Sequence, residues 1–250
     1  MADRAQTEVL GYVLVFAVIV LTVALVTGPG QAGLQNTRDA QQTANVEEGF
    51  AVLAENIDDV VREGVPSRAT EFDLAGQRVA LGPPVTVRVT ATYTNGSIAF
   101  DRTHSVRPIT YRAESGAELV YVNGAVVARG QDGGVAMIRE PRMVVSSDRA
   151  VVPVINTSLD RRQLRGRDEV VDRESRLLVR TEERGVPAVN QTTANVTLTI
   201  EITSPRAAAW QAYLERALDG TCSMSGDTVT CSGETGAATL VVTRVDVSLE

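Results

Sequence analysis

Lysine is absent from this chain of 250 residues, so all 24 basic residues are arginines, and they are outnumbered by 31 acidic residues. The resulting net charge of −7 opposes binding to a phosphate backbone, so the composition argues against a nucleic-acid-binding protein. An acidic chain without lysine is typical of a GC-rich genome and a salt-loving host, in which a carboxylate-rich surface aids solubility. That inference concerns the host and not the activity.

Motifs of catalysis are missing as well. The sequence contains no GxSxG nucleophile elbow, no Walker loop, no GxGxxG after a predicted strand, no HExxH and no calcium loop. The single histidine, His104, lies in the strand-like run FDRTHSVR. The acidic pair Asp58-Asp59 is more typical of a solvated face than of catalytic carboxylates. We therefore expect no enzyme activity, no cofactor and no metal site.

Cysteine is scarce: Cys222 and Cys231 stand in TCSMSGDTVTCSG with eight residues between them. Two thiols cannot form a structural zinc site without further ligands, and His104 is far away in the sequence. Two interpretations are left. The cysteines form a disulfide across a hairpin if the domain lies outside the cell, or they are two free thiols. We expect the disulfide.

One long apolar run stands near the start of the sequence. Val9 to Val26 are 18 uncharged residues, which span about 27 Å as a helix and nearly match the core of a lipid bilayer. A secretory signal has a shorter apolar region followed by small residues at a cleavage site, for which TGPGQAG is only a weak match. No cysteine stands directly after the run, which excludes a lipoprotein. The run predicts a retained membrane anchor, with ordinary secretion as the alternative.

The residues at and before the edge of this run are MADRAQTE. A short basic stub, a small residue, a polar residue and then a long apolar helix resemble the class III signal of archaeal type IV pilins. The resemblance implies that a prepilin peptidase on the cytoplasmic side cuts between Ala5 and Gln6, directly after Arg4, and leaves the helix in place. A carboxylate such as Glu8 is unfavourable in lipid without a partner. We expect Glu8 to pair with the new amino terminus of a neighbouring subunit during assembly, although it does not occupy the position of the bacterial pilin glutamate.

The stretch TGPG at residues 27–30 predicts the end of the first helix, because proline lacks an amide donor and glycine loosens the backbone. We expect a leader stub at 1–5, a transmembrane helix at 6–27 and a polar linker at 28–45. An amphipathic helix is expected at 46–64, since apolar residues recur there at spacings of 4, 3, 4 and 3. They are Val46, Phe50, Leu53, Ile57 and Val60.

From residue 70 to residue 250 the pattern changes mainly to alternation with period two, which predicts a β-rich domain. Apolar residues alternate with Thr and Arg from Val85 to Tyr93, and Asn95-Gly96 then supplies a hairpin turn. A second Asn-Gly turn follows at 123–124. Further strands are expected at 134–138, 143–155, 176–180, 195–202 and 239–249. The whole predicts an α+β fold with a mainly antiparallel, β-sandwich-like ectodomain that contains one inserted helix.

The inserted helix is expected in SPRAAAWQAYLERALDG, with Ser204 as N-cap, Pro205 at the first helical position and Gly220 as the stop. Trp210, the only tryptophan, lies on its apolar face. A tryptophan at this spacing belongs to a core more often than to a ligand site, so we expect Trp210 in the core.

Four N-glycosylation sequons lie beyond the apolar run, which agrees with an exported domain. They begin at Asn95, Asn156, Asn190 and Asn195. The strongest basic cluster is RRQLRGR at 161–167. The acids that follow it at once neutralise its charge, so a solvated loop is favoured over a site for an anionic partner.

Three stretches of the chain resemble a group of haloarchaeal type IV pilin-like membrane proteins of uncharacterised function. They are TEVLGY at 7–12, ENIDDVVREGVPSRATEF at 55–72 and SPRAAAWQAYLE at 204–215. The resemblance covers most of the chain and implies a pilin-like N-terminus with a β-rich ectodomain, but no reaction. We therefore expect a processed cell-surface subunit that joins a type IV pilus-like filament or a pseudopilus.

The partners that this hypothesis implies are the membrane, the prepilin peptidase, a pilus-type assembly ATPase with its platform protein, and like or related pilin subunits. The N-terminus would lie in the cytoplasm and the C-terminal domain outside the cell. The alternative is a permanently anchored single-pass surface protein whose β domain binds the envelope or another cell. A third hypothesis, an anchored hydrolase, lacks recognisable machinery.

Overall fold

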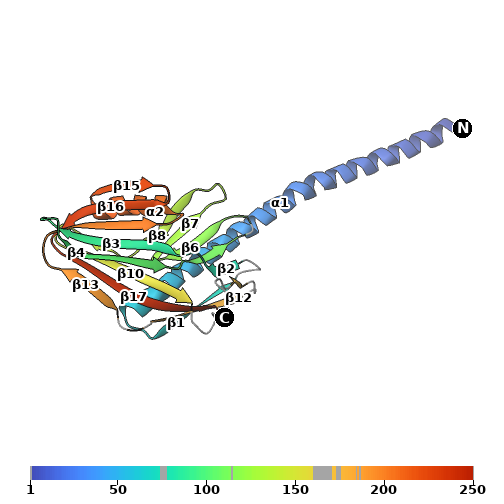
Figure 1. Ribbon diagram of the computed structural model, residues 1–250. Helices are drawn as coiled ribbons and strands as arrows, with labels where there is room; N and C mark the ends of the chain where they lie inside the picture. The colour runs from blue at the N-terminus through green and yellow to red at the C-terminus, as the bar shows by residue number, and fades with distance from the viewer. Residues whose placement is uncertain are drawn as a thin grey trace. The chain divides into compact units, whose positions relative to one another are not determined.

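The computed structural model describes residues 2–73, 78–113, 115–159, 171–172, 176–183, 185 and 187–249. Among these, it describes the side chains of all residues except 2–11, 23–40, 159, 171–172 and 176–177. The chain divides into two units, Met1–Asn45 and Val46–Glu250. The described part is α+β with mostly antiparallel sheets, as the sequence predicts (Figure 1).

Helix α1 extends without interruption from Ala2 to Arg62. The predicted helix end at TGPG is therefore wrong, because the backbone is helical through it. The segment predicted as a polar linker, 28–45, is also helical. A proline inside a helix removes one hydrogen bond and costs about 3 kcal/mol. The residues after Pro29, QAGLQNTRDAQQTAN, are rich in Gln and Ala, which favour a helix beyond the proline. The predicted helix end near Gly64 is confirmed, and Gly64 has a φ of 67°.

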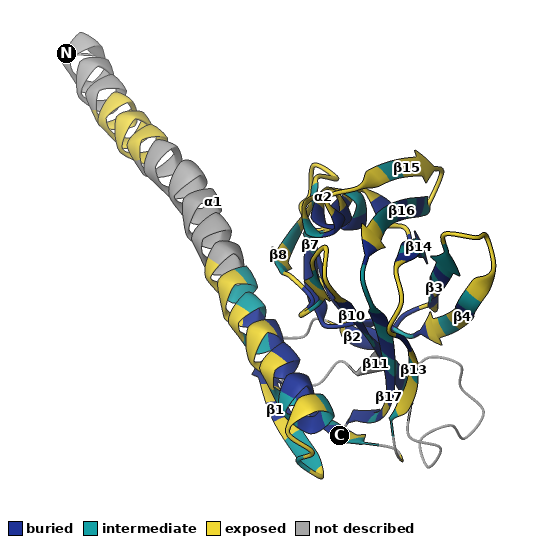
Figure 2. Ribbon diagram, turned by 90° about the vertical axis from the view of Figure 1, so that its left-hand side faces the viewer, coloured by how far each residue is buried: buried dark blue, intermediate teal, exposed yellow. Residues whose placement is uncertain are grey.

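Between Tyr12 and Leu21, the side chains of α1 are apolar and exposed. The large apolar side chains between Tyr12 and Leu21 are 50% to 85% exposed (Figure 2). Thr22, the last of the described side chains in this stretch, donates to the carbonyl oxygen of Val18 at 2.7 Å. Apolar residues thus occupy every side of the helix here, and no stripe is distinguished from the rest.

The described residues of the second unit form three sheets (Figure 1). The first has the order β1-β12-β17-β10-β9, with β13 also paired to β17: Ser67–Asp73, Arg176–Glu183, Ala238–Leu249, Ala150–Leu159, Val144–Val145 and Ala188–Thr192. The second has the order β11-β2-β5-β6-β7-β8: Val171–Asp172, Arg78–Leu81, Ile109–Arg112, Glu118–Val122, Ala125–Arg129 and Val135–Arg139. The third has the order β15-β16-β14-β3-β4: Thr221–Ser225, Thr228–Thr235, Val196–Thr203, Val85–Tyr93 and Ile98–Val106.

Strand pairing follows the predicted turns closely, with one exception. Asn95-Gly96 joins β3 to β4, and Asn123-Gly124 joins β6 to β7 with φ of 51° at Asn123 and 81° at Gly124. The strand predicted at 143–155 is instead two strands, β9 and β10, which form an antiparallel pair. Among the pairs of described strands, only β10 and β17 run parallel. No local sequence pattern predicts this pairing.

Two hydrophobic clusters lie on opposite faces of the second sheet. Alternate residues of β6 point to different clusters: Val120 belongs to one and Tyr121 to the other. The first cluster contains Trp210 and the inner faces of β3, β14 and β16. The second contains the end of α1, where the predicted stripe is confirmed by exposed fractions of 0% to 2% (Figure 2). These residues are Val46, Phe50, Leu53, Ile57 and Val60.

The inserted helix, α2, spans Ala207–Leu218. It begins later than predicted, because Ser204 closes a turn instead of capping the helix: its carbonyl accepts the amide of Ala207 at 3.0 Å. The left-handed C-cap is Asp219 and not Gly220. A glycine is nevertheless required at 220, since a Cβ there would overlap the carbonyl oxygen of Ser232. Trp210 is fully buried, so its prediction as a core residue is confirmed.

Candidate functional site

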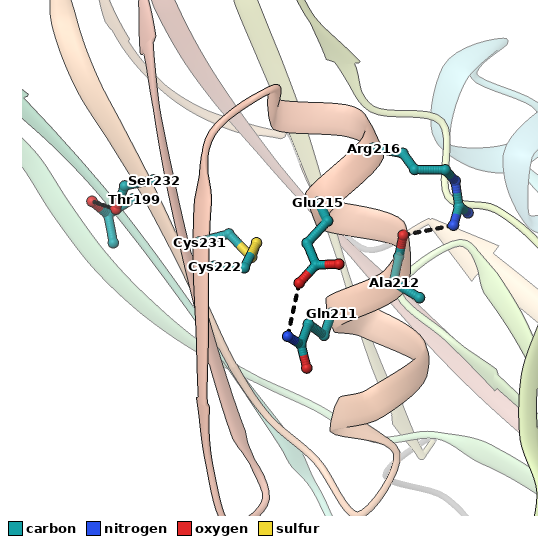
Figure 3. The surroundings of a disulfide bond; sticks show 8 residues. All are labelled: Thr199, Gln211, Ala212, Glu215, Arg216, Cys222, Cys231 and Ser232. Carbon is teal, nitrogen blue, oxygen red and sulfur yellow. Dashed lines mark hydrogen bonds between the residues drawn. A yellow bond between two sulfur atoms is a disulfide. The ribbon is translucent and has the colours of Figure 1, made fainter.

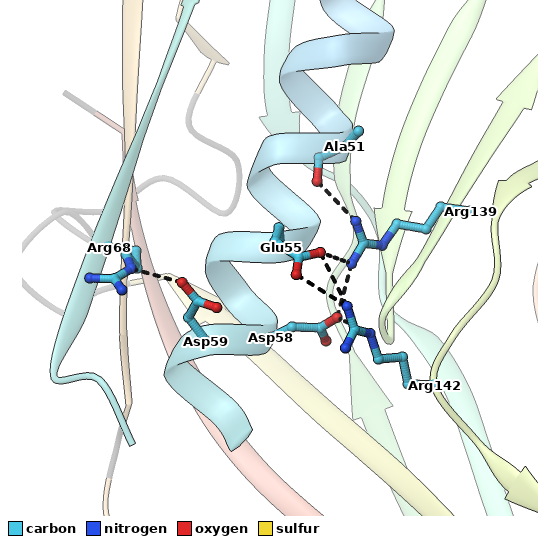
Figure 4. A network of polar contacts seen from close by, with 7 residues as sticks. All are labelled: Ala51, Glu55, Asp58, Asp59, Arg68, Arg139 and Arg142. Carbon is cyan, nitrogen blue, oxygen red and sulfur yellow. Dashed lines mark hydrogen bonds and ion pairs between the residues drawn. The ribbon is translucent and has the colours of Figure 1, made fainter. Parts of the chain in front are cut away.

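The end of α1 carries two acids that meet two arginines of the β domain (Figure 4). Arg139 Nη2 lies 2.6 Å from Glu55 Oε2 and 3.0 Å from Asp58 Oδ2. Arg142 Nε lies 2.9 Å from Asp58 Oδ2, and Arg142 Nη2 lies 3.1 Å from Glu55 Oε1. The acids face the same side because residues three apart are neighbours on a helix. This network ties α1 to the segment around β8.

The two acids differ in their surroundings. The Glu55 side chain is 53% exposed, and its hydrogen bond to Arg139 lowers its pKa. The Asp58 side chain is only 9% exposed, and burial raises its pKa although both guanidiniums act in the opposite direction. The interpretation of Asp58-Asp59 as part of a solvated face is therefore wrong for Asp58. Asp59 is partly exposed and forms a separate ion pair with Arg68 at 3.1 Å (Figure 4).

A cleft of about 290 Å³ opens beside this network. It is bounded by the last turn of α1, the turn between β6 and β7, and strands β9, β10 and β17. Its aliphatic lining consists of Val61, Val144, Val151, Pro153, Ile155 and Val241. Its polar lining includes Arg62, Arg142 and Arg149, all exposed, together with Asn123 and the buried Asp58. The cleft thus combines apolar surface with a cluster of positive charges.

Asn123 occupies a special place in this cleft. Its side chain belongs to a residue that is only 1% exposed, and Asn123 Oδ1 accepts the backbone amide of Ile155 at 2.8 Å. This bond joins the β6–β7 turn to β10. The Nδ2 group of the same amide is buried and has no hydrogen-bond partner in the described part of the chain. A buried donor without a partner costs roughly 1–3 kcal/mol, so such a group is an indication of a ligand or a water.

A second polar site lies at the other end of β6. The buried carboxylate of Glu118 pairs with Arg112 at 2.9 Å and with the largely buried Arg206. A cavity of about 350 Å³ adjoins these three side chains and also contacts Arg129. One carboxylate thus joins two strands to the turn before α2. Arg206 is consequently fixed in position before the helix begins.

The predicted processing residues Arg4, Ala5 and Gln6, and the predicted assembly residue Glu8, belong to the helical backbone of α1. Their side chains lie outside the described residues. The basic cluster at 161–167 also lies outside the described residues. These predictions stay predictions.

Cys222 and Cys231 form a disulfide, which confirms the predicted bridge and rules out two free thiols (Figure 3). They are directly opposite each other in β15 and β16, with Cα atoms 4.1 Å apart. Helix α2 packs on this hairpin, and Gln211 on it donates to Glu215 at 2.8 Å (Figure 3). The bridge therefore supports a small hairpin that covers one side of α2.

Two of the four sequons, Asn95 and Asn195, lie at one end of the third sheet. Asn95 is exposed in the β3–β4 turn, where its Oδ1 accepts the amide of Ser97 at 2.9 Å. Asn195 is exposed directly before β14, whose first residue pairs with Tyr93. Asn190 is half-buried on β13. The fourth, Asn156, is half-buried in β10.

His104 lies on β4, as the sequence predicts. Burial lowers its pKa, with further lowering by Arg102 and Arg244. Its Nε2 is buried and makes no hydrogen bond to any described residue. Among the described residues, no three His, Cys, Asp or Glu side chains gather as a metal site.

The cleft and the contact of Asn123 with β10 were not predicted from the sequence. The Asn123-Gly124 pair was recognisable as a hairpin turn, and that prediction is correct, but the same asparagine also holds the edge of β10. No local signal could reveal this, because the contact joins residues 32 positions apart. Arg139 and Arg142, by contrast, stand in IREPRM as ordinary charged residues, and only the fold brings them to Glu55 and Asp58.

Two further observations bear on function. Within the part of the chain that was described, no helix carries an apolar stretch long enough to cross a lipid bilayer. A protein-family model described as a family of unknown function (DUF7289) matches residues 4–250. No curated protein and no solved structure matches the chain.

Proposed function

The chain belongs to the family DUF7289, whose function is unknown, and we propose from its own residues that it is a pilin-like cell-surface subunit. In this proposal, the N-terminus is processed and α1 assembles with α1 of like subunits into a type IV pilus-like filament or a pseudopilus. The observation that carries the proposal is a helix that is apolar on all sides between Tyr12 and Leu21 and whose end is built into a β-rich domain.

The exposed start of α1 supports this role. Large apolar side chains between Tyr12 and Leu21 that are 50% to 85% exposed are unfavourable in water, at about 25 cal/mol for each Å² of apolar surface. Lipid covers such a surface before assembly, and the helices of neighbouring subunits cover it in a filament. In the sequence, the uncharged run from Val9 to Val26 nearly matches the bilayer core in length, and the side chains at both of its ends lie outside the described residues.

The buried end of α1 supports the same role mechanically. Phe50 is fully buried and meets Phe72 of β1 edge to face, with ring centroids 5.4 Å apart. Arg139 and Arg142 bind the acids of the following turns. A subunit that is held in a filament by its helix must keep its outer domain on that helix. These contacts are of the kind that do so.

Processing and assembly are assigned to the first residues of α1. We propose that a prepilin peptidase cuts between Ala5 and Gln6, directly after Arg4, so that Gln6 becomes the first residue. The new α-amino group then pairs with Glu8 of an adjacent subunit, which offsets the high cost of a carboxylate in an apolar setting. A pilus-type ATPase and a platform protein would drive the insertion of each subunit.

The disulfide and the sequons favour an extracellular location for the β-sandwich-like domain. Disulfides persist in oxidising compartments, and the exposed Asn95 and Asn195 are accessible to a glycosylating enzyme. The proposed topology is single-pass, with the N-terminus in the cytoplasm and the β domain outside. Protease added to intact cells should then degrade the β domain, and protection until lysis would contradict this topology.

The second candidate is a permanently anchored surface protein whose β domain binds the envelope or another cell. It is favoured by the same exposed apolar helix, because a lipid anchor needs no neighbouring subunits. The two candidates differ in the fate of the residues before Gln6. The plain anchor keeps them, whereas the pilin-like subunit loses them.

The deciding experiment is N-terminal sequencing of the membrane-extracted protein. A mature chain that begins at Gln6 supports the pilin-like function. A chain that still begins at Met1 or Ala2 favours the plain anchor, and one that begins near Gln31 indicates an ordinary secretory signal. Arg4→Glu should block processing, while Arg38→Glu, a charge reversal beyond the apolar run, should not. Glu8→Ala should leave processing intact but abolish filaments in electron micrographs.

A further inference from the structure

Asn123 lines the cleft beside the end of α1, and its side-chain amide is fixed in position. Asn123 Oδ1 accepts the amide of Ile155 at 2.8 Å, so the orientation of the side-chain amide is determined by the backbone of β10. The opposite atom, Nδ2, is buried and makes no hydrogen bond within the described residues. A group that can accept from Nδ2 inside the cleft would remove the cost of this unpaired donor.

The charges around the cleft are unbalanced in favour of an anion. Asp58 is the one carboxylate in the described lining, and it is already paired with Arg139 and Arg142. Arg62 and Arg149 also line the cleft, both are exposed, and no ion pair joins either to a described carboxylate. A guanidinium binds a carboxylate through two parallel hydrogen bonds. The cleft therefore has positive charge in excess on a protein whose net charge is −7.

The aliphatic residues of the lining determine the shape and polarity of the uncharged part of the ligand. Val61 from α1, Val144 from β9 and Val241 from β17 present aliphatic surface from three separate elements. The volume of about 290 Å³ is near the lower limit of the roughly 300–1,000 Å³ that is usual for small-molecule sites. The ligand must therefore be short, branched or both, and apolar along most of its length.

We propose that this cleft binds a small aliphatic monocarboxylate. Its carboxylate lies at the rim among Arg62, Arg142 and Arg149, with one oxygen accepting from Asn123 Nδ2, and its aliphatic chain covers Val144 and Val241. The site is independent of processing and assembly, since every residue that forms it belongs to the second unit.

Isothermal titration calorimetry of the full chain in a neutral maltoside detergent tests the site, with 4-methylpentanoate as the probe. Titration into the detergent alone measures partition into micelles and is subtracted. Two related compounds separate the two parts of the ligand: 4-methylpentanamide lacks the charge, and acetate lacks the aliphatic body. We expect saturable binding of 4-methylpentanoate at one site, and affinities at least about tenfold weaker for both related compounds.

Two surface substitutions locate the site without disturbing the core. Arg149→Gln should weaken binding by about tenfold, while the matched change Arg102→Gln, on exposed β4, should leave it unchanged. Val144→Phe fills the mouth of the cleft from a side chain that is 49% exposed, and it should abolish binding. Its matched control is Ile98→Phe, at a side chain that is 61% exposed and remote from the cleft lining.

A third substitution addresses Asn123 itself. Asn123→Asp keeps the acceptor for the Ile155 amide and replaces the donor, so it should weaken binding at least tenfold in a chain whose melting temperature shows that it is folded. Equal affinity for the amide and the carboxylate would indicate apolar adsorption and overturn the proposal. Binding of acetate as tight as that of 4-methylpentanoate, or unchanged binding after Val144→Phe, would overturn it too.

Discussion

Two stretches of α1 contain the same kinds of apolar side chain, but these are exposed in one stretch and buried in the other. Phe16 is 68% exposed, in a stretch whose large apolar side chains are all at least half exposed, whereas Phe50 is fully buried against Phe72. The difference lies in the spacing. The first stretch is apolar at every position, whereas the second has a buried apolar stripe that starts at Val46 and charged residues on its other sides. Apolar content alone thus does not identify a core, whereas a stripe at helical spacing does.

The polar residues sharpen the contrast. Between Tyr12 and Leu21 the chain has no charged residue, so one side of the helix is chemically like another. In the second stretch, Glu55 and Asp58 orient the helix, because each must reach Arg139 or Arg142. A uniform surface suits many interchangeable neighbours, while a stripe with specific ion pairs suits one fixed partner.

The largest expected change in the free energy of unfolding distinguishes Phe50 from Phe16. Phe50→Ala should lower the free energy of unfolding of the β domain by about 3–5 kcal/mol, because a buried aromatic ring leaves a cavity in the second cluster. Phe16→Ala should leave this free energy unchanged. Urea titration followed by the fluorescence of Trp210, the only tryptophan and fully buried, measures both. Equal losses for the two variants would contradict the division of α1.

Loss of the disulfide should lower the free energy of unfolding by a somewhat smaller amount. It also tests whether the buried stretch of α1 unfolds together with the whole β domain. Replacing Cys222 and Cys231 by serine opens a short loop and should cost about 2–3 kcal/mol in the chain-entropy model. If the domain is cooperative, amide exchange around Phe50 should accelerate as well, although the disulfide is in the other cluster. The double Ser223→Ala, Thr230→Ala variant keeps the bridge and is the control. Unchanged exchange around Phe50 would show that α1 unfolds independently.

The ion pairs at the end of α1 should contribute less. Asp58→Asn removes the buried charge but keeps an acceptor, so we expect a loss of about 1.5 kcal/mol, near the lower limit for hydrogen bonds to charged groups. The matched change Asp59→Asn breaks a partly exposed pair with Arg68 and should cost clearly less. The urea midpoints of the two variants test this order, and a larger loss for Asp59→Asn would reverse our assignment.

The smallest expected effect is the pH dependence of stability that arises from His104, on β4. Burial lowers the pKa of His104 below its ordinary value of 6.5, so the unfolded chain binds a proton at a higher pH than the folded chain does. The stability that the neutral imidazole contributes is therefore fully present above pH 6.5, and it is lost as the pH falls through the folded pKa. His104→Gln should flatten the dependence of the urea midpoint between pH 7.5 and pH 5.5. A slope that persists in this variant would assign the effect to another group.

Local patterns predicted much of this fold. The stripe of α1, the Asn-Gly turns, the burial of Trp210 and the bridge between Cys222 and Cys231 all follow from neighbouring residues, and all are confirmed. The helix through Pro29 was not predicted, because proline is a strong signal for a helix end. The helix-forming residues that follow Pro29 in the sequence favour the opposite outcome.

Long-range contacts account for the features of the site that the sequence could not predict. Asn123 reaches β10 across 32 residues, and Arg139 reaches Glu55 across 84. The cleft is assembled from α1, the β6–β7 turn and three strands. Periodicity reports only which face of an element is apolar, and it carries no information on which elements meet. A binding site made in this way is visible only after the sheets have formed.

The position of β17 has a consequence for the order in which the protein folds. This strand pairs with β10, β12 and β13, all of which precede it in the chain, and its pairing with β10 joins residues 88 positions apart. As the ribosome extends the chain, those three strands are synthesised before the strand that connects them. Contacts of such long range form slowly. Until β17 is synthesised, the first sheet cannot close over the end of α1.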